Sequence, residues 1–174
     1  MCDKNAKTVS DVYRYSALLE AFGPKLGKRR RWLVTGAAGF IGSHLAEALL
    51  SAGQEVVGLD DLSAGYRRNL VLALSGAGEG AEARFRFIEG SIADPELCRT
   101  ACEGVDFVLH HAALASVPLS MERPLAFSAV NTEGFVNVLE GARAQGVRRV
   151  VYASSSAVYG DDPRLPKSED MPGR

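Results

Sequence analysis

The chain has 174 residues, of which 47% are hydrophobic, and this content is enough for the core of one domain of ordinary size. Its 20 basic and 21 acidic side chains nearly cancel, which argues against nucleic acid or a membrane surface as a partner held by overall charge. The cysteines are too few and too unevenly spaced for a disulfide framework, and no His or Cys cluster has the spacing of zinc ligands. Binding must therefore come from a local site.

The first thirty residues form a polar extension before the first predicted strand. They lack the apolar core of a signal peptide, and no apolar segment of the sequence is long enough to cross a bilayer, so we expect no membrane insertion and a cytoplasmic protein. Apolar residues from Tyr13 to Phe22 recur at helical spacing and predict a short amphipathic helix. The basic run at 28–31 is interpreted as a solvated lead-in to the strand. We predict an extension over residues 1–30 and a domain over residues 31–174.

The stretch RWLVTGAAGFIG, which occupies positions 31–42, organises this domain. An apolar run ends in three glycines and gives way to a helical pattern near Phe40, which predicts a strand, a tight turn and a helix. Gly36 would permit the sharp exit from the strand, Gly39 would let backbone approach a phosphate, and Gly42 would let the helix pack close to the sheet. The helix N-terminus would then direct its N–H groups at the diphosphate of a dinucleotide. The alternative is an ordinary glycine-rich turn, because the spacing is one residue longer than G-x-G-x-x-G.

A second apolar run ends in Asp60, at about the twenty-residue distance expected for a ribose-binding carboxylate. A carboxylate accepts hydrogen bonds from both ribose hydroxyls, whereas it would repel a ribose phosphate. The cofactor is therefore predicted to be NAD rather than NADP. Arg67 and Arg68 in the following loop weaken this preference without reversing it.

The rest of the chain alternates between strand-like and helix-like patterns. Strands are predicted at 84–88, 106–110 and 149–153, and helices at 95–103 and over a long segment from about 124 to 145. The glycine-rich and alanine-rich stretch at 75–82 predicts a surface loop. This alternation predicts an α/β fold with a Rossmann-like, doubly wound parallel sheet, truncated after about the fifth strand, with the ligand at the carboxyl ends of the strands.

Several blocks of sequence resemble a known family. They are WLVTGAAGFIG at 32–42, VGLDD at 57–61, GVDFVLHHAALASVP at 104–118, NTEG at 131–134, YASSSAVYG at 152–160 and LPKSED at 165–170. In these blocks the chain resembles the extended short-chain dehydrogenase/reductase superfamily and, within it, the NAD-dependent sugar-nucleotide epimerases and dehydratases. The subgroup that it resembles most closely is the bacterial UDP-N-acetylglucosamine 4-epimerases.

The resemblance implies roles for the residues at matching positions. The pyrophosphate would be held by Gly36, Gly39, Phe40, Ile41 and Gly42, and the adenosine ribose by Asp60. Further cofactor contacts would come from Asp61, Ser63, Gly65, Ser91, Ile92, Ala112, Ala113 and Leu114. The position of Ser91 is usually acidic in the family, so this residue is a departure from the pattern.

Two further positions are matched near the substrate, and a third, Asn131, is matched to the cofactor site. Ser116 and Val117 would lie near the sugar of a UDP-sugar substrate. Asn131 matches a buried asparagine of the family, which either ties a helix to a strand or takes part in catalysis. In the full-length protein the long segment after residue 124 would contribute to a homodimer.

The catalytic hydroxyl of the superfamily matches Ser155, with Ser156 as an assistant, although serines at a strand end can also be an ordinary polar loop. In the family this serine hydrogen-bonds a sugar hydroxyl, while a tyrosinate takes the proton and a hydride passes to NAD. The tyrosinate belongs to a Tyr-x-x-x-Lys pair, and no tyrosine of this sequence is followed four positions later by lysine. We therefore expect an N-terminal fragment without epimerase activity of its own.

The alternatives are a sugar-nucleotide dehydratase or decarboxylase of the same family and a noncatalytic NAD-binding module. Dehydratases tend to carry an acidic pair after the hydroxyl residue, whereas Ser156 and Ala157 follow Ser155 here. We predict no metal-binding or acid–base role for the three histidines. His44 would face solvent, and His110 and His111 would end the fourth strand beside the cofactor.

Overall fold

The computed structural model describes residues 26–171 and residue 173. Its strands are β1 (Arg31–Thr35), β2 (Glu55–Asp60), β3 (Phe85–Glu89), β4 (Phe107–His110) and β5 (Arg149–Tyr152). Its helices are α3 (Phe40–Ser51), α4 (Arg67–Ala77), α5 (Pro95–Ala101), α6 (Val117–Glu122), α7 (Pro124–Ser128) and α8 (Phe135–Ala144). Shorter helical segments are η1 (Glu82–Arg84), η2 (Ala129–Gly134) and η3 (Ser156–Tyr159).

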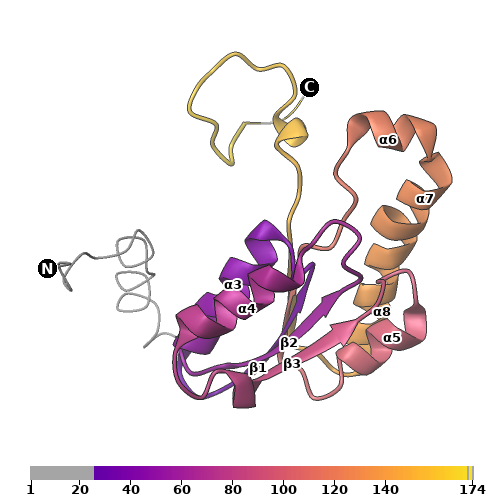
Figure 1. The fold of residues 1–174 in the computed structure, drawn as a ribbon. Helices are drawn as coiled ribbons and strands as arrows, with labels where there is room; N and C mark the ends of the chain where they lie inside the picture. The colour runs from indigo at the N-terminus through magenta and orange to yellow at the C-terminus, as the bar shows by residue number, and fades with distance from the viewer. Residues whose placement is uncertain (1–25, 172, 174) are drawn as a thin grey trace, which may run out of the picture.

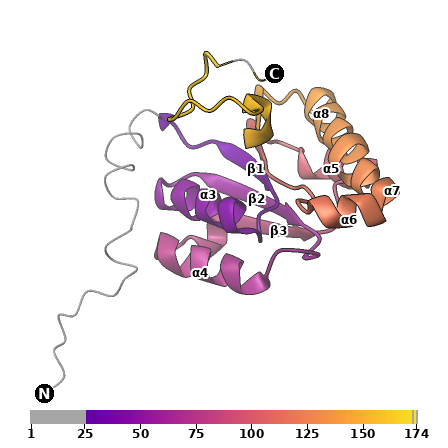
Figure 2. The same cartoon turned by 90° about the horizontal axis from the view of Figure 1, so that it is seen from above.

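The strands form one parallel sheet in the order β3-β2-β1-β4-β5. Helices α3 and α4 cover one face, and α5 and α8 cover the other (Figures 1 and 2). Neighbouring residues of a strand therefore enter different cores: Leu33 packs with the α5 and α8 side, and Val34 packs with the α3 and α4 side. Burial on both faces explains why the central strands read as continuous apolar runs. The predicted α/β fold is confirmed.

Strand β1 lies between β2 and β4, so the order of the strands reverses around it. The loop after β1 leads to α3 on one face, whereas the chain after β4 continues towards helices on the other face. Ligands of doubly wound sheets bind in the crevice that this divergence opens at the carboxyl ends of the strands. The topology thus places a crevice where the sequence predicted one.

The long helical segment predicted from about 124 to 145 is confirmed. Helices α7 and α8 follow one another, but the π-helical segment η2 joins them and changes the register of the helical faces. The loop predicted at 75–82 was partly wrong, because α4 continues to Ala77. A Cβ on Gly76 would meet only the end of the flexible Glu47 side chain of α3, at 2.2 Å.

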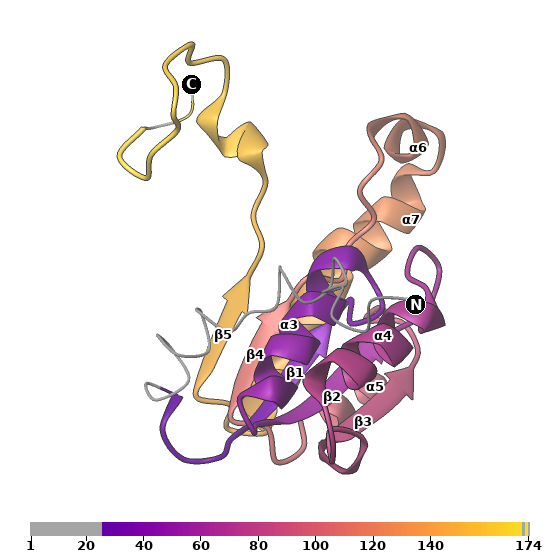
Figure 3. The same cartoon turned by 60° about the vertical axis from the view of Figure 1, so that its left-hand side comes forward.

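One further expectation concerns the N-terminal part of the chain. The predicted amphipathic helix and nearly all of the 1–30 extension lie outside the described residues, so the division at residue 30 stays a prediction. Strand β5 forms an edge of the sheet. It pairs only with β4 among the described strands, and Val151 and Tyr152 are exposed. After β5 the chain leaves the sheet and forms an arm, while α6 and α7 form a second arm (Figure 3).

Changing Gly42 to alanine tests the packing of α3 against the turn. A Cβ at Gly42 would lie 2.0 Å from the Gly36 carbonyl oxygen, whereas a Cβ at Gly39 would lie 3.2 Å from that same atom. We expect Gly42→Ala to lower the free energy of unfolding by about 1–3 kcal/mol, despite the higher helix propensity of alanine. Gly39→Ala serves as the matched control in chemical denaturation. Equal stability of the two variants would contradict this packing.

Candidate functional site

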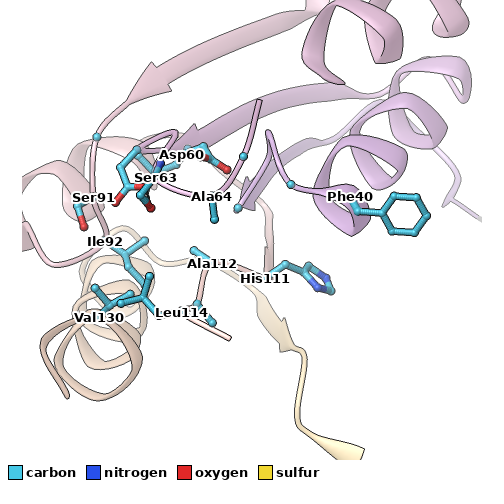
Figure 4. Close-up of a pocket in the computed structure, with 17 residues that line it drawn as sticks. Phe40, Asp60, Ser63, Ala64, Ser91, Ile92, His111, Ala112, Leu114 and Val130 are labelled. Carbon is cyan, nitrogen blue, oxygen red and sulfur yellow. Dashed lines mark hydrogen bonds between the residues drawn. The ribbon is translucent and has the colours of Figure 1, made fainter. Parts of the chain in front are cut away.

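A pocket of about 260 Å³ opens at the carboxyl edge of the sheet, where β1, β2 and β4 end (Figure 4). Its wall combines loops that are far apart in the sequence. The lining residues are Gly36, Gly39, Phe40, Leu59, Asp60, Asp61, Ser63, Ala64, Gly65, Gly90, Ser91, Ile92, His111, Ala112, Ala113, Leu114 and Val130. Most of the residues predicted to bind a cofactor are therefore brought together.

The turn after β1 forms one wall of the pocket. Gly36 has φ of +68°, and its N–H donates to the Leu59 carbonyl at 2.8 Å, which holds the turn against β2. A Cβ on Gly36 would lie 2.9 Å from the Ala112 amide nitrogen, so the loop after β4 leaves room only for glycine. The sequence assigned Gly36 to this sharp exit, and the geometry agrees.

The N-terminus of α3 faces the pocket with its backbone. No side chain caps this terminus, and its first turn carries no acidic residue. Phe40 turns its ring away from the pocket and leaves it 79% exposed, so this residue contributes backbone to the wall (Figure 4). Uncapped amide groups with the positive end of the helix dipole are suited to a phosphate or another anion.

Asp60 ends β2 with its side chain almost fully buried. One carboxylate oxygen accepts the Ala38 amide at 2.9 Å, and the other accepts the Leu62 amide at 2.8 Å. The carboxylate thereby joins the glycine-rich turn to the loop after β2. A carboxylate has about four acceptor positions, so it can still accept from ligand hydroxyls.

The loop after β2 interlocks with the glycine-rich turn through the backbone of one residue. The Ala38 carbonyl accepts from the Tyr66 amide at 3.0 Å and from the Asn69 side chain at 2.7 Å. Gly65 approaches so closely that a Cβ there would lie 2.8 Å from the Ala38 carbonyl carbon. The Asp61 carboxylate, in contrast, bonds within its own loop, to the amide and hydroxyl of Ser63.

Two histidines lie at the end of β4. Burial, with a smaller contribution from His111, lowers the pKa of His110 from its ordinary 6.5 to about 4. Burial also lowers the pKa of His111. Both imidazoles are therefore neutral at pH 7. Within the described part of the chain, the buried Nδ1 atom of His111 has no hydrogen-bond partner.

Asn131 lies in η2 and bonds the loop after β4 reciprocally. Its Oδ1 accepts the Leu114 amide at 2.9 Å, and its Nδ2 donates to the Leu114 carbonyl at 2.9 Å. The expectation that this asparagine is buried was wrong, since its position at the η2 turn leaves it exposed. Of the two roles left open, this geometry favours tying the helix to the loop that follows the strand.

Other predicted residues lie outside the pocket lining. Ile41 is 55% exposed because Gly42 and Ser43 take the inward face of the first turn of α3. Ser116 caps α6 through the Leu119 amide, and Val117 is exposed on the same helix. Ser155 caps η3 through the Ala157 amide at 3.1 Å and is exposed, as is Ser156.

His111, which was expected beside the cofactor, lines the pocket. The pocket also contains residues that were not predicted as ligand contacts: Leu59, Ala64, Gly90 and Val130. Leu59 and Gly90 come at the ends of β2 and β3, so the rule that ligands bind at carboxyl ends could have indicated them. No sequence rule could have indicated Val130, because it is the π-helical segment η2 that brings this residue to the pocket.

The remaining candidate sites do not form a second chemical centre. Arg30 pairs with Asp106 at 3.0 Å and Arg31 with Glu55 at 2.9 Å, near the amino ends of the strands. Cys98 and Cys102 are buried free thiols, and burial raises their pKa to about 12 and about 11, so they are unreactive. Over residues 26–171 and 173, no group of three or more His, Cys, Asp or Glu could hold a metal ion, and no helix is long and apolar enough to span a membrane.

Fold and pocket together define a Rossmann-like α/β domain with a phosphate-compatible turn and an acid at the end of its second strand. A family model described as the NAD dependent epimerase/dehydratase family matches residues 32–174. The chain belongs to this family.

Among its relatives is a UDP-glucose 4-epimerase of Mycolicibacterium smegmatis, 46% identical over 144 residues, which are 82% of this chain and 44% of that protein. A UDP-N-acetylglucosamine 4-epimerase structure from Methanobrevibacter ruminantium matches with a TM-score of 0.70 and 31% identity, covering 84% of this chain and 44% of that one. A dTDP-glucose 4,6-dehydratase structure from Streptomyces venezuelae, with NAD bound, matches with a TM-score of 0.71 and 37% identity, covering 83% of this chain and 45% of that one. This chain thus spans less than half of each of these proteins.

The neutral state of His110 predicts a pH dependence of stability. Its pKa is about 4 in the folded chain and ordinarily 6.5, so between these values the unfolded chain binds the proton and the folded chain does not. The free energy of unfolding should therefore fall by up to about 3 kcal/mol as the pH falls from 6.5 to 4. Denaturation curves of His110→Asn should lack this component.

His44→Gln, at an exposed position on α3, is the control and should keep the pH profile of the unchanged chain. If His110→Asn and the unchanged chain lose the same free energy over this range, His110 is not the group responsible.

Proposed function

We propose that this chain is the cofactor-binding part of an NAD-dependent UDP-sugar 4-epimerase. The observation that carries the proposal is the pocket in which the uncapped N-terminus of α3 and the carboxylate of Asp60 face the same space. One group suits an anion and the other suits hydroxyls, which is the combination that a dinucleotide presents. Membership of the family supports the same conclusion.

The pocket lining allows the parts of the cofactor to be assigned. The diphosphate would lie against the backbone of Gly36, Gly39 and Phe40, where no side chain intervenes. The adenosine half would lie between the loop of Ser63 and Gly65 and the turn of Ser91 and Ile92. The nicotinamide half would extend along Ala112, Ala113 and Leu114, with the Nδ1 atom of His111 within the same wall.

The proposed substrate is a UDP-hexose, with UDP-N-acetylglucosamine and UDP-N-acetylgalactosamine as the favoured pair because of the sequence blocks shared with that subgroup. When bound, NAD supplies a hydride acceptor for the sugar. Ser155 would orient a sugar hydroxyl, with Ser156 beside it and with Ser116 and Val117 near the sugar. Exposure of Ser155 outside the cofactor pocket is compatible with a substrate that arrives from the adjacent side.

A dehydratase of the same family is the second candidate, since a dehydratase is among the similar structures. The residues after Ser155 favour the epimerase, because Ser156 and Ala157 stand where dehydratases tend to carry an acidic pair. A noncatalytic NAD-binding module would use the same pocket and would differ only in lacking sugar chemistry.

We also propose that the full-length protein forms a homodimer through helices that include α7 and α8. Exposed apolar side chains along this part of the chain support it: Leu125, Val136 and Leu139 are exposed. A cytoplasmic location completes the proposal and agrees with the free thiols of Cys98 and Cys102.

The selectivity for NAD can be measured by titration. We expect NAD to bind at least about tenfold more tightly than NADP, because the buried Asp60 carboxylate repels a ribose phosphate. Asp60→Ala should weaken the binding of NAD more than the binding of NADP and so bring the two dissociation constants close together. Glu79→Ala removes one exposed carboxylate remote from the pocket and should keep the preference. Tighter binding of NADP by the unchanged chain would refute the proposal.

The chain on its own should not turn over sugar nucleotides. A proton acceptor of the Tyr-x-x-x-Lys type is required for the proposed chemistry, and the sequence contains no such pair. Incubation with NAD and UDP-N-acetylglucosamine, followed by chromatography of the nucleotide sugars, should yield no UDP-N-acetylgalactosamine. Robust interconversion would mean that another residue acts as the base.

A further inference from the structure

Thr35 and His110 end the two strands that flank the crevice. Thr35 is the last residue of β1, His110 is the last residue of β4, and the two pair in register. Both are buried, at 0% and 7% exposure. Immediately after them, the chain from His111 to Leu114 forms one wall of the pocket.

The hydroxyl of Thr35 is shared by three groups. Its Oγ1 accepts the amide of His111 at 3.1 Å and the amide of Ala112 at 3.2 Å. The same oxygen lies 2.8 Å from Nδ1 of His110. The His111 amide also lies 3.2 Å from the Thr35 backbone carbonyl, so of the two amides it is the one of Ala112 that depends on the Thr35 side chain.

This arrangement determines the hydrogen-bond roles of His110. A hydroxyl has two lone pairs and one proton, so an oxygen that already accepts two amides can only donate to a third partner. The Thr35 hydroxyl thus donates to Nδ1 of His110, which must carry no proton. The neutral ring then has its proton on Nε2. Burial of the ring, which packs 5.4 Å from the ring of Phe135, agrees with a neutral imidazole.

The loop has no room to shift towards the turn. A Cβ on Gly36 would lie 2.9 Å from the Ala112 nitrogen and from the His111 carbonyl group, so the glycine turn and the loop are already in contact. The amides of His111 and Ala112 therefore have one position in which they satisfy their bonds and clear the turn.

We propose that Thr35 and His110 are positioning residues that set the width of the cofactor crevice. Thr35 holds the wall formed by His111 and Ala112, and His110 orients the Thr35 hydroxyl by accepting its proton. Neither side chain needs to touch the cofactor. This inference rests on the proposed function for its effect on NAD binding, but not for its effect on the loop itself.

The test compares Thr35→Val with Thr35→Ser. Valine keeps the shape of threonine and removes the oxygen, whereas serine keeps the oxygen. In Thr35→Val we expect amide hydrogen exchange at Ala112 to accelerate at least about tenfold and NAD affinity to fall at least about tenfold. Thr35→Ser should restore both to within about threefold of the unchanged chain.

The ¹⁵N resonances of His110 supply a readout that loss of packing alone would not move. In the unchanged chain Nδ1 should have the chemical shift of an unprotonated, hydrogen-bonded nitrogen, and this shift should move in Thr35→Val and return in Thr35→Ser. A protonated Nδ1 in the unchanged chain would overturn the proposal. So would unchanged exchange at the Ala112 amide in a folded Thr35→Val variant.

A second pair of variants keeps the test decisive if Thr35→Val does not fold. His110→Asn places an acceptor oxygen near the position of Nδ1, and His110→Leu does not, so only the asparagine variant should retain slow exchange at Ala112. Equal exchange in the two variants would overturn the role of His110. If the unchanged chain fails to bind NAD, the proposed function fails, while the exchange and nitrogen measurements still decide the positioning role.

Discussion

The close approach of backbone at the end of β1 is the constraint on which the rest of the site depends. Gly36 adopts positive φ and donates to the carbonyl of Leu59, and a side chain there would collide with the loop after β4. Gly42 lets the first turn of α3 lie directly on that turn. Together these contacts aim the uncapped end of α3 into the crevice between β1 and β4, where the strand order reverses. A helix displaced by a side chain at either glycine would direct its dipole elsewhere, so the anion site follows from packing rather than from any charged residue.

Asp60 adds a second requirement to the same crevice. A buried carboxylate is costly unless it is hydrogen-bonded, and here backbone amides of Ala38 and Leu62 satisfy both oxygens. The same bond to the Ala38 amide ties this carboxylate to the turn whose backbone amides suit an anion.

Sequence patterns predicted the strands and the loops at their carboxyl ends because each depends on short-range features, namely apolar runs, glycines and strand-ending polar residues. These predictions failed where contacts between residues far apart in the sequence determine the local structure. The glycines and alanines after Ser75 predicted a loop, but α4, which packs against α3, continues to Ala77. Asn131 was expected to be buried, but a π-helical turn exposes it and points its amide at Leu114. The interaction of Thr35 with His110 joins residues far apart in the chain, and no spacing rule relates them.

The polar side chains of the pocket mostly hold one another's loops rather than stand ready for chemistry. Asp60, Asn131 and Thr35 each bond backbone amides of a neighbouring loop. Such bonds fix the walls, and they leave backbone groups and small side chains to face a ligand. The residues matched to sugar chemistry, Ser155 and Ser156, are instead exposed beyond β5, where the chain has left the sheet. The pocket thus lies at the centre of the fold, whereas the serines proposed to contact the sugar stand on a separate segment. Relatives that share this centre can therefore differ in the reaction that they catalyse, as the epimerases and the dehydratase among them do.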